Sequence, residues 1–304
     1  MISNAPQTAA ETLGEWVDAA ADRMAEADLF FGHGTAEARD EACWIASGAL
    51  GMAPDFPARR FADALSSEQR RRLDRVLDQR IATRKPLAYL LGEAWFAGLR
   101  FRCDQRSLVP RSPLAEPIVD GLSPWLALDR SLFVLDVGTG SGCIACALAH
   151  HWPSLRVDAA DISADAVALA RDNIARLGLD DRVRVFRSDV YDGLPEARYD
   201  LIVSNPPYVP DASLAALPAE YRHEPALGLR AGRDGLDVVR RLLAGAPDRL
   251  APGGYLLMEV GEAQPQTEAL LGTVDATWLE LARGGDGVVL LDRDACTVWK
   301  GRNP

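Results

Sequence analysis

The sequence has no long uninterrupted run of apolar residues. Nowhere does it approach the roughly 18 consecutive apolar residues of a helix that crosses a membrane. Its beginning, Met1 to Glu11, has neither the basic nor the apolar segment of a secretory signal peptide. Apolar residues make up 48% and charged residues 25% of the 304 residues, the balance of a globular protein with a sizeable core. We therefore expect no membrane partner and a cytoplasmic location.

Cysteine and histidine are scarce, with five cysteines and four histidines. The odd number and wide spacing of the cysteines argue against a disulfide framework. Cys143 and Cys146 have the spacing of a redox or zinc pair, but no second pair of Cys or His completes a site. We expect both to fill the core as small side chains. His150 and His151 are interpreted as structural, and no metal is expected.

Positive charge is in the minority, since the net charge is −11. The molecule as a whole is expected to repel nucleic acid at long range. The segment Arg70–Lys85 is the exception, because it carries Arg70, Arg71, Arg72, Arg75, Arg80 and Arg84. This segment is either a solvated helix face, partly balanced by Asp74 and Asp78, or a patch that contacts RNA. The sequence leaves both interpretations open.

Residues 1–85 have a helical pattern and no strand-like run. One helical face is formed by apolar residues at helical spacing, namely Leu13, Trp16, Val17, Ala20 and Met24. A second helix carries Cys43, Ile45 and Leu50, and a capping box formed by Ser66 and Gln69 begins a third. The sequence predicts an N-terminal helical bundle. Residues 86–111 form a connector in which Leu87–Leu91 and Trp95–Phe101 flank Gly92 and Gly98 like a β-hairpin.

From Leu132 onward, apolar runs alternate with helical segments. The predicted strands are 132–137, 156–161, 183–187, 200–204 and 254–260, and the predicted helices lie near 142–151, 164–177 and 234–250. Such alternation predicts βαβ units and a mainly parallel, doubly wound α/β sheet over residues 112–304. The tail, 277–283 and 288–293 around Gly284–Gly287, is predicted to form an antiparallel hairpin at the sheet edge.

The first of these strands runs into a glycine-rich turn. This turn contains Asp136, Gly138, Thr139, Gly140 and Gly142. Glycine lets the backbone approach a ligand closely, and the helix that follows supplies free N–H groups. Dinucleotide-binding enzymes use a related loop, so the loop by itself leaves NAD and S-adenosylmethionine as alternatives.

The details of the loop favour S-adenosylmethionine. The glycine spacing is G-x-G-x-G, whereas pyrophosphate-binding loops have G-x-G-x-x-G. Asp136 precedes the first glycine by two positions, where it would repel a pyrophosphate but attract a cationic group. Asp161 ends the next predicted strand about 20 residues on, where a carboxylate can accept hydrogen bonds from ribose hydroxyls. Asp189 follows the third strand and either meets the adenine amino group or caps a helix.

The fourth predicted strand ends in the turn Asn205-Pro206-Pro207-Tyr208. Ligands of open α/β sheets bind beyond the carboxyl ends of the strands, so this turn is expected to face the glycine loop. The two prolines have fixed φ angles and no N–H, which makes the turn stiff. The Asn205 side-chain oxygen and the Pro206 carbonyl can accept one hydrogen bond each from a planar –NH2 group. Positioning of this kind aids methyl transfer to the nitrogen, and Tyr208 supplies an aromatic wall.

From about Pro86 to Gly287 the sequence resembles the protein-(glutamine-N5) methyltransferases. The glycine loop, Asp161, Ser188-Asp189 and Asn205–Tyr208 carry the resemblance. It implies an N-terminal helical domain for substrate recognition, joined through a β-hairpin to a seven-stranded, Rossmann-like methyltransferase domain. It also implies cofactor contacts at the glycine loop, Asp161, Asp189 or Val190, and Asn205, and a glutamine-binding turn at Asn205–Tyr208.

Two further segments, Leu108–Glu116 and Glu220–Pro225, are similar to the branch of this family that methylates a large-subunit ribosomal protein, the third in standard order. The alternative branch acts on peptide-chain release factors. His223 and Glu224 are expected to line the rim of the substrate site. A nucleic-acid adenine-N6 methyltransferase, which can share the Asn-Pro-Pro-Tyr turn, is the alternative from a different class, and a non-enzymatic ribosome assembly factor is another.

Overall fold

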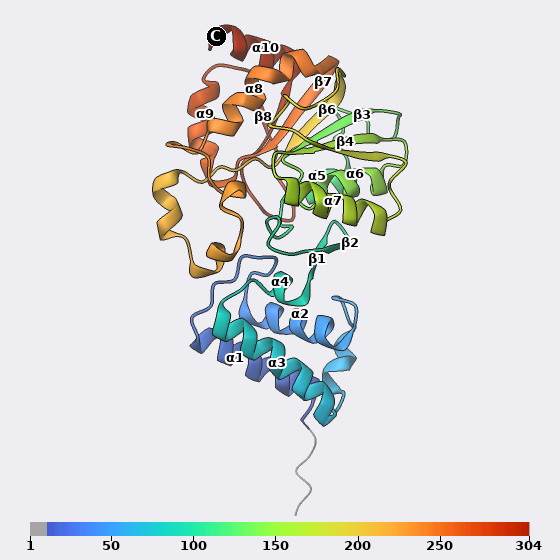
Figure 1. The fold of residues 1–304 in the computed structure, drawn as a ribbon, viewed down its shortest axis with the longest axis vertical. Coiled ribbons are helices and arrows are strands. Elements are labelled where there is room, and N and C mark those ends of the chain that lie inside the picture. The colour runs from blue at the N-terminus through green and yellow to red at the C-terminus, as the bar shows by residue number, and fades with distance from the viewer. Residues whose placement is uncertain (1–10, 304) are drawn as a thin grey trace, which may run out of the picture. The chain divides into compact units, whose positions relative to one another are not determined.

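The computed structural model describes residues 11–303, which form two units (Figure 1). One unit consists of the chain up to Gly92 together with the short segment Pro218–His223. The other consists of Glu93–Leu217 and the chain from Glu224 onward. Within the described residues, no helix combines the length and the apolar character needed to span a membrane.

The first unit is a small helical bundle. Its helices are α1 (Leu13–Glu26), α2 (Ala38–Leu50), α3 (Ser67–Thr83) and α4 (Leu87–Leu91), with short 3₁₀ turns at η1 (Ala58–Ala62) and η3 (Ala219–His223). All five apolar residues predicted to share one face of the first helix are buried, which confirms that prediction. The capping box is also confirmed, because the Gln69 N–H donates to Ser66 Oγ at 3.2 Å and the Ser66 N–H to Gln69 Oε1 at 3.0 Å.

A buried ion cluster joins α2, α3 and the segment Pro218–His223. Arg80 Nε donates to Glu41 Oε1 at 2.5 Å, and Arg80 Nη1 lies 3.6 Å from Glu220 Oε1. All three side chains are at most 2% exposed. Arg84 approaches the same Glu220 oxygen at 3.0 Å. Including Arg80 in a solvent-exposed basic face was therefore wrong, because three buried charges compensate one another here.

The hairpin of the connector is present but shorter than predicted. Strands β1 (Glu93–Phe96) and β2 (Leu99–Arg102) pair antiparallel around Ala97 and Gly98. Both turn residues have positive φ angles, 48° and 78°, as a tight two-residue hairpin turn requires. Assigning Leu87–Leu91 to the hairpin was wrong. These residues form α4 and end at Gly92, whose left-handed conformation closes the helix.

The second unit contains a seven-stranded sheet with the order β5-β4-β3-β6-β7-β9-β8. Its strands are β3 (Phe133–Val137), β4 (Arg156–Asp161), β5 (Val183–Arg187), β6 (Tyr199–Ser204), β7 (Leu250–Glu259), β8 (Thr277–Trp278) and β9 (Val288–Asp292). Strands β3 to β7 are parallel, whereas β9 and β8 are antiparallel to their neighbours. The doubly wound sheet and its antiparallel tail are confirmed.

Helices cover both faces of this sheet (Figure 1). One face packs against α5 (Ala115–Asp120), α6 (Cys143–His151) and α7 (Ala164–Arg176), and Cys143 and Cys146 lie in that core as predicted. The other face packs against α8 (Asp237–Arg249), α9 (Gln264–Leu271) and α10 (Arg293–Arg302). Short 3₁₀ turns at η2 (Asp211–Ala216), η4 (Ala226–Gly228) and η5 (Gly261–Ala263) complete the unit.

Three of these helices, α5, α9 and α10, were not predicted, and the tail strands are shorter than expected. The predicted strand 277–283 is reduced to the two residues of β8. The strand predicted to run to residue 293 stops at Asp292, whose carboxylate accepts a hydrogen bond from the Ala295 N–H at 2.7 Å. That contact is an N-cap, so α10 begins at Arg293.

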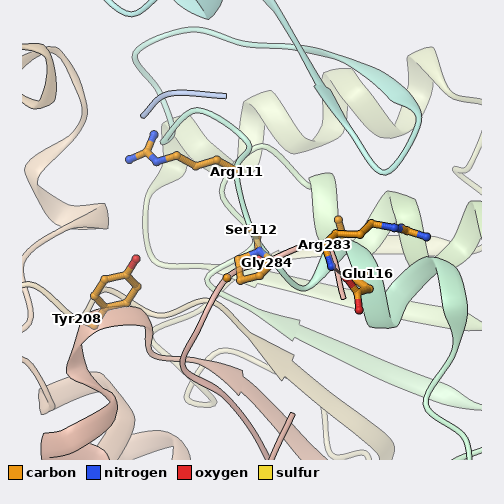
Figure 2. Close-up of a pocket in the computed structure, with 9 residues that line it drawn as sticks. Arg111, Ser112, Glu116, Tyr208, Arg283 and Gly284 are labelled. Carbon is orange, nitrogen blue, oxygen red and sulfur yellow. Dashed lines mark hydrogen bonds between the residues drawn. The ribbon is translucent and has the colours of Figure 1, made fainter. Parts of the chain in front are cut away.

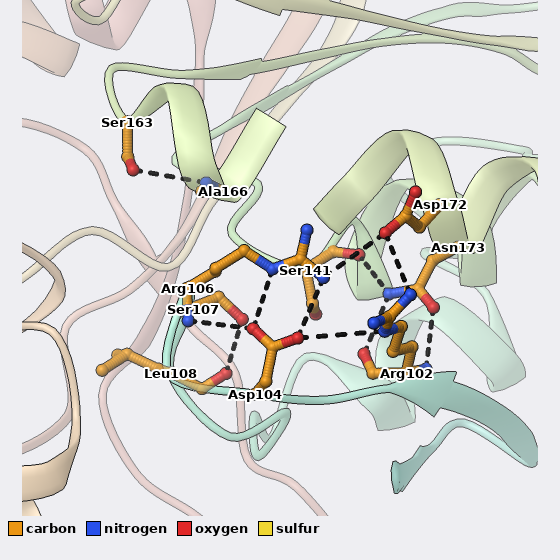
Figure 3. A network of polar contacts seen from close by, with 10 residues as sticks. All are labelled: Arg102, Asp104, Arg106, Ser107, Leu108, Ser141, Ser163, Ala166, Asp172 and Asn173. Atoms are coloured by element: carbon orange, nitrogen blue, oxygen red, sulfur yellow. Dashed lines mark hydrogen bonds and ion pairs between the residues drawn. The ribbon is translucent and has the colours of Figure 1, made fainter. Parts of the chain in front are cut away.

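Asn173 fastens the hairpin to the glycine-rich turn (Figure 3). Its Oδ1 accepts from the Arg102 N–H at 2.7 Å, and its Nδ2 donates to the Arg102 carbonyl at 3.1 Å and to the Ser141 carbonyl at 2.9 Å. The side chain is 1% exposed. One side chain on α7 therefore satisfies three backbone groups from two separate segments, and the bond to Ser141 is buried.

We expect Asn173→Ala to lower the free energy of unfolding by about 3 kcal/mol, because three backbone groups, one buried and two partly buried, lose their partner. Urea unfolding followed by circular dichroism measures the change. The neighbouring variant Asp172→Ala is the control, since this 42% exposed carboxylate makes only surface ion pairs, with Arg102 and Arg106, and should cost less than about 1 kcal/mol. Equal losses of unfolding free energy in the two variants would contradict the role of Asn173 in linking the hairpin to the glycine-rich turn.

Candidate active site

The glycine-rich turn and the Asn-Pro-Pro-Tyr turn meet at the carboxyl edge of the sheet. Val137 on β3 pairs with Ser204 on β6, and Ser204 Oγ donates to the Val137 carbonyl at 2.7 Å. Gly138 and Asn205 are the next residues on the two strands. A Cβ atom on Gly138 would lie 3.9 Å from the Asn205 carbonyl oxygen. Two motifs separated by more than sixty positions in the sequence are thus brought into contact.

The glycine loop has a backbone that other residues rarely adopt. Gly138, Gly140 and Gly142 have φ angles of 75°, 55° and 80°, in the left-handed region that favours glycine. The Gly138 and Thr139 N–H groups donate to the Ala160 carbonyl on β4 at 2.8 and 2.9 Å. Gly142 caps the start of α6. The loop is therefore folded against the end of β4, with the helix N-terminus behind it.

Asp136 lies beneath the loop with one carboxylate oxygen unused. Its Oδ2 accepts from Thr139 Oγ1 at 2.5 Å and from the Ala145 N–H at 3.1 Å. Its Oδ1 is buried and has no hydrogen-bond partner among the described residues. Burial raises the pKa of Asp136 to about 7. A buried acceptor without a donor is costly unless a ligand supplies one.

Asp161 ends β4, and Asp189 and Val190 follow β5. Asp161 Oδ2 accepts from the Gly140 N–H and Oδ1 from the Ser163 N–H, both at 2.9 Å, while burial raises the pKa of Asp161. Asp189 forms an ion pair with Arg241 on α8 at 2.7 Å. Val190 is buried at a φ angle of 53°, an uncommon conformation for a β-branched residue. Such strain is often found at functional sites.

The Asn-Pro-Pro-Tyr turn lies against two glycines. A Cβ atom on Gly261 would come within 2.8 Å of Tyr208 Cζ, and one on Gly235 within 2.5 Å of the Tyr208 carbonyl oxygen. Neither glycine leaves room for a side chain, so the backbone packs directly on both sides of Tyr208. This close packing fixes the position of the aromatic ring.

A cavity of about 420 Å³ opens beside Tyr208 (Figure 2). Tyr208 and Arg111 lie on one side of it, and Glu116 and Arg283 on the other. The carboxylate of Glu116 accepts from the Ala282 and Arg283 N–H groups, both at 2.7 Å. The lining residues are Arg111, Ser112, Pro113, Ala115, Glu116, Tyr208, Arg283, Gly284 and Gly285.

His223 and Glu224 are adjacent in sequence but belong to different units. In the helical unit, His223 Nε2 lies 2.9 Å from the Thr83 carbonyl, so this nitrogen carries the proton. In the sheet unit, Glu224 accepts two hydrogen bonds of 2.6 Å from Arg111 and one of 2.9 Å from the Val109 N–H. The Glu224 carboxylate is therefore occupied by groups of the protein itself.

Glu259 also belongs to this edge of the sheet and was not singled out from the sequence, whereas its partner Ser112 lies in the segment Leu108–Glu116, which was noted only for its resemblance. Ser112 Oγ donates to Glu259, which ends β7 beside Asn205. One signal was available, because Glu259 is a lone acidic residue in the apolar run Leu256–Val260. Its partner Ser112 lies 147 positions away, and no local pattern connects the two.

A glycine loop above an unsatisfied carboxylate suits a cationic sulfonium compound better than a pyrophosphate. With the order of the sheet strands, it defines the class of an S-adenosylmethionine-dependent methyltransferase. Comparison with known proteins leads to the same class. Residues 122–217 match the family described as "Methyltransferase small domain", and residues 15–92 match "PrmC N-terminal domain".

Whole-chain relatives define the family more closely. The chain is 44% identical to the ribosomal protein uL3 glutamine methyltransferase of Bordetella pertussis, over 93% of this chain and 96% of that protein. It is 48% identical to the protein of the same name from Xylella fastidiosa (strain Temecula1), over 92% and 90% of the two chains. The chain belongs to the family of these glutamine methyltransferases. Among solved structures, a methyltransferase from Pyrococcus furiosus aligns with a TM-score of 0.46 at 20% identity, over 73% of this chain and 98% of that chain.

The residues at the loop fit S-adenosylmethionine. The unpartnered Asp136 Oδ1 lacks a donor, and the amino group of the cofactor is a cationic donor. Glycines line the approach, since a Cβ atom on Gly138 would meet no atom outside the neighbouring residues closer than 3.9 Å. The carboxylate of Asp161 sits beside Gly140 at the end of β4, where it can accept further hydrogen bonds.

We expect the affinity for S-adenosylmethionine to rise with pH up to about 7. Burial raises the pKa of Asp136 to about 7, and only the ionised carboxylate attracts a cation, so affinity should fall about tenfold per pH unit below that value. Calorimetric titration between about pH 5.5 and about pH 6.7, at least one unit below the pKa of an α-amino group, measures it. Asp136→Asn should bind more weakly and lose this dependence. If the affinity of Asp136→Asn changed with pH as in the unaltered protein, the pH dependence would belong to another group.

Proposed function

We propose that the protein transfers a methyl group from S-adenosylmethionine to the N5 side-chain amide of a glutamine in large-subunit ribosomal protein uL3. The observation that carries the reaction is that Asn205 and Gly138 directly follow the paired residues Ser204 and Val137 at the ends of β6 and β3. The substrate is supported by the names of relatives whose length this chain covers by 90% or more. Ribosomal protein is therefore the proposed partner, rather than a release factor or a nucleic acid.

The Asn205–Tyr208 turn holds the substrate amide. Asn205 Oδ1 and the Pro206 carbonyl each accept one N–H of the glutamine –NH2 group. Pro207 stiffens the turn, and Tyr208, whose ring is packed against Gly261, forms a wall for the flat amide. Bound S-adenosylmethionine supplies the methyl group from its sulfonium. The amide nitrogen needs no prior deprotonation, because its proton leaves once the nitrogen is methylated and cationic.

The cofactor-binding residues are proposed to be Asp136, Gly138, Thr139, Gly140, Gly142, Asp161, Asp189, Val190 and Asn205. Asp136 takes the amino group of the cofactor and Asp161 the ribose hydroxyls. Because the Asp189 carboxylate is paired with Arg241, we favour the strained backbone at Val190 for the adenine contact. This choice follows from the ion pair, which leaves Asp189 partly neutralised.

Residues 1–85 are proposed to recognise the substrate, with residues 86–111 as connector and 112–304 as the methyltransferase domain. His223, half-buried and hydrogen-bonded to the Thr83 carbonyl, supplies part of that recognition. Glu224 supports the substrate site indirectly, because it fixes Arg111 at the cavity beside Tyr208.

We expect purified protein to transfer labelled methyl from S-adenosylmethionine to uL3, and Asn205→Ala to lower the rate at least about 100-fold, because the amide loses its orientation. Mass spectrometry of the product locates the methylated glutamine. Asn303→Ala, at an exposed asparagine that follows α10, is the control and should retain the activity. Labelling of a release factor in place of uL3 would exclude the proposed substrate, and labelling of DNA alone would exclude the class.

The basic face of α3 is proposed to contact ribosomal RNA when the substrate is part of an assembling particle. Arg80 and Arg84 are not part of this face, since the buried ion cluster holds both. Arg70 and Arg72 form surface ion pairs with Glu11 and Glu68. Arg71 and Arg75 are exposed and have no ion pair among the described residues, which leaves them for phosphate.

Arg71→Glu/Arg75→Glu should therefore lower activity on assembling large-subunit particles about tenfold while leaving activity on free uL3 unchanged, because only the particle presents phosphate. Parallel methylation assays at low and high salt measure the ratio. The matched control is Asp74→Asn/Asp78→Asn on the same helix, which removes negative charge and should not weaken activity on particles. An equal loss on both substrates would exclude the RNA contact.

A further inference from the structure

Strand β7 ends in a buried carboxylate next to the catalytic turn. Ser204 on β6 pairs in parallel register with Met258 on β7, so Asn205 and Glu259, the next residues, are neighbours at the same edge of the sheet. Glu259 is only 4% exposed, and the residues on either side of it in the sequence are buried and apolar. A carboxylate in such surroundings is costly unless polar groups stabilise it. The polar groups that stabilise the Glu259 carboxylate therefore indicate its role in the protein.

Two side chains approach the Glu259 carboxylate, those of Ser112 and Asn205. Ser112 Oγ donates to Glu259 Oε2 and itself accepts from the Leu114 N–H at 3.2 Å, so its hydroxyl proton is directed to the carboxylate. The Asn205 side chain, next to Glu259 at the ends of the paired strands, lies close enough for a hydrogen bond that lowers the pKa of this carboxyl. Glu259 thus links the Ser112 segment, which lines the cavity, with the catalytic asparagine.

The chemistry of the two groups determines which end of the Asn205 amide faces Glu259. An ionised carboxylate can only accept hydrogen bonds, and the sole donor on an asparagine side chain is Nδ2. The oxygen and nitrogen of such an amide are told apart by their partners. With Nδ2 held by Glu259, Oδ1 is at the opposite end, as an acceptor for an incoming N–H.

We propose that Glu259 is a positioning residue that fixes the Asn205 side-chain amide with Oδ1 presented to the substrate nitrogen. The substrate part of this assignment rests on the proposed function. Asn205 alone would rotate between two orientations, and the wrong one would point a donor at the donor N–H of the substrate. Ser112 keeps Glu259 in place, so the Arg111–Pro113 segment contributes to catalysis through two successive hydrogen bonds.

The charge of Glu259 determines the orientation in which the Asn205 side-chain amide is held. A protonated Glu259 can donate to Asn205 Oδ1 and so hold the amide in the reverse orientation. Burial raises the pKa of Glu259 to about 7, while Ser112, Arg111 and Asn205 act in the opposite direction. The charged group near Glu259 on the segment of Ser112 is Arg111, which is itself paired with Glu224. On the neighbouring strand β9, the residue opposite Glu259 is the apolar Val288. Asp136 on β3 is the second carboxyl of this edge with a pKa of about 7.

Nuclear magnetic resonance of the side-chain amides tests the orientation without any substrate. The Asn205 signal is identified by its absence from Asn205→Ala. It should move with pH around a midpoint of about 7 in the unaltered protein and in Asp136→Asn, because Glu259 still titrates in both. It should not move in Glu259→Gln. A signal that has the same position in Glu259→Gln as in the unaltered protein, or one that still moves with pH in Glu259→Gln, overturns the proposal.

Kinetics test the consequence for catalysis. Glu259→Gln should lower kcat about tenfold, since the glutamine amide can also donate to Asn205 Oδ1, while KM for the protein substrate and Kd for S-adenosylmethionine stay unchanged. In the Asn205→Ala background the same substitution should cost nothing further, as expected for residues acting as one unit. The exposed neighbour Glu262 provides the matched control, Glu262→Gln, with unaltered kcat.

The outcomes separate this proposal from the proposed function. A raised KM with unchanged kcat in Glu259→Gln, or losses that add in the double variant, overturns the positioning role. If uL3 is not methylated but the Asn205 signal follows Glu259, the substrate assignment fails and the fixed orientation of the amide stands. Thermal unfolding of Glu259→Gln, compared with Glu262→Gln, shows that any loss of kcat occurs in a folded protein.

Discussion

The parallel pairing of β3 with β6 is the contact on which the rest of the site depends. It sets Val137 opposite Ser204, and the Ser204 hydroxyl closes the pairing on the Val137 carbonyl. Only in this register do Gly138 and Asn205 emerge side by side. A slip of one residue would turn every side chain of a strand to the other face, and the apolar residues packed on both faces exclude it. The packing of the sheet therefore fixes the distance between the glycine loop and the Asn205–Tyr208 turn.

The same edge of the sheet gathers acidic rather than basic side chains. Asp161 and Glu259 end their strands and Asp136 lies one residue before the end of β3, and burial raises the pKa of each. Each has different partners: the loop for Asp136, backbone N–H groups for Asp161, and Ser112 with Asn205 for Glu259. Such a site is suited to a cationic cofactor and to a neutral amide. It offers little to a phosphate backbone, in agreement with the net charge of −11.

Elements with a strong local pattern could be predicted from the sequence, and elements held by distant partners could not. The buried face of α1, the Ser66–Gln69 capping box and the parallel strands follow from periodicity and capping alone. Arg80 looked like one more solvated arginine, because its partners Glu41 and Glu220 lie far away in the sequence. For the site, the two glycine- and proline-rich motifs were visible as patterns. The hydrogen bond from Ser112 to Glu259 depends on tertiary packing, and its only sign in the sequence is a single acidic residue within an apolar run.

The segment Pro218–His223 is part of the helical unit although the chain on either side of it belongs to the sheet unit. The helical unit is therefore a split domain, built from two stretches of sequence and completed by the buried carboxylate of Glu220. Cutting the chain after Gly92 would leave Arg80 with one fewer counter-ion and expose Glu220. A chimera that exchanges this unit between relatives consequently needs three junctions instead of one, and residues 218–223 have to be transplanted together with the N-terminal helices.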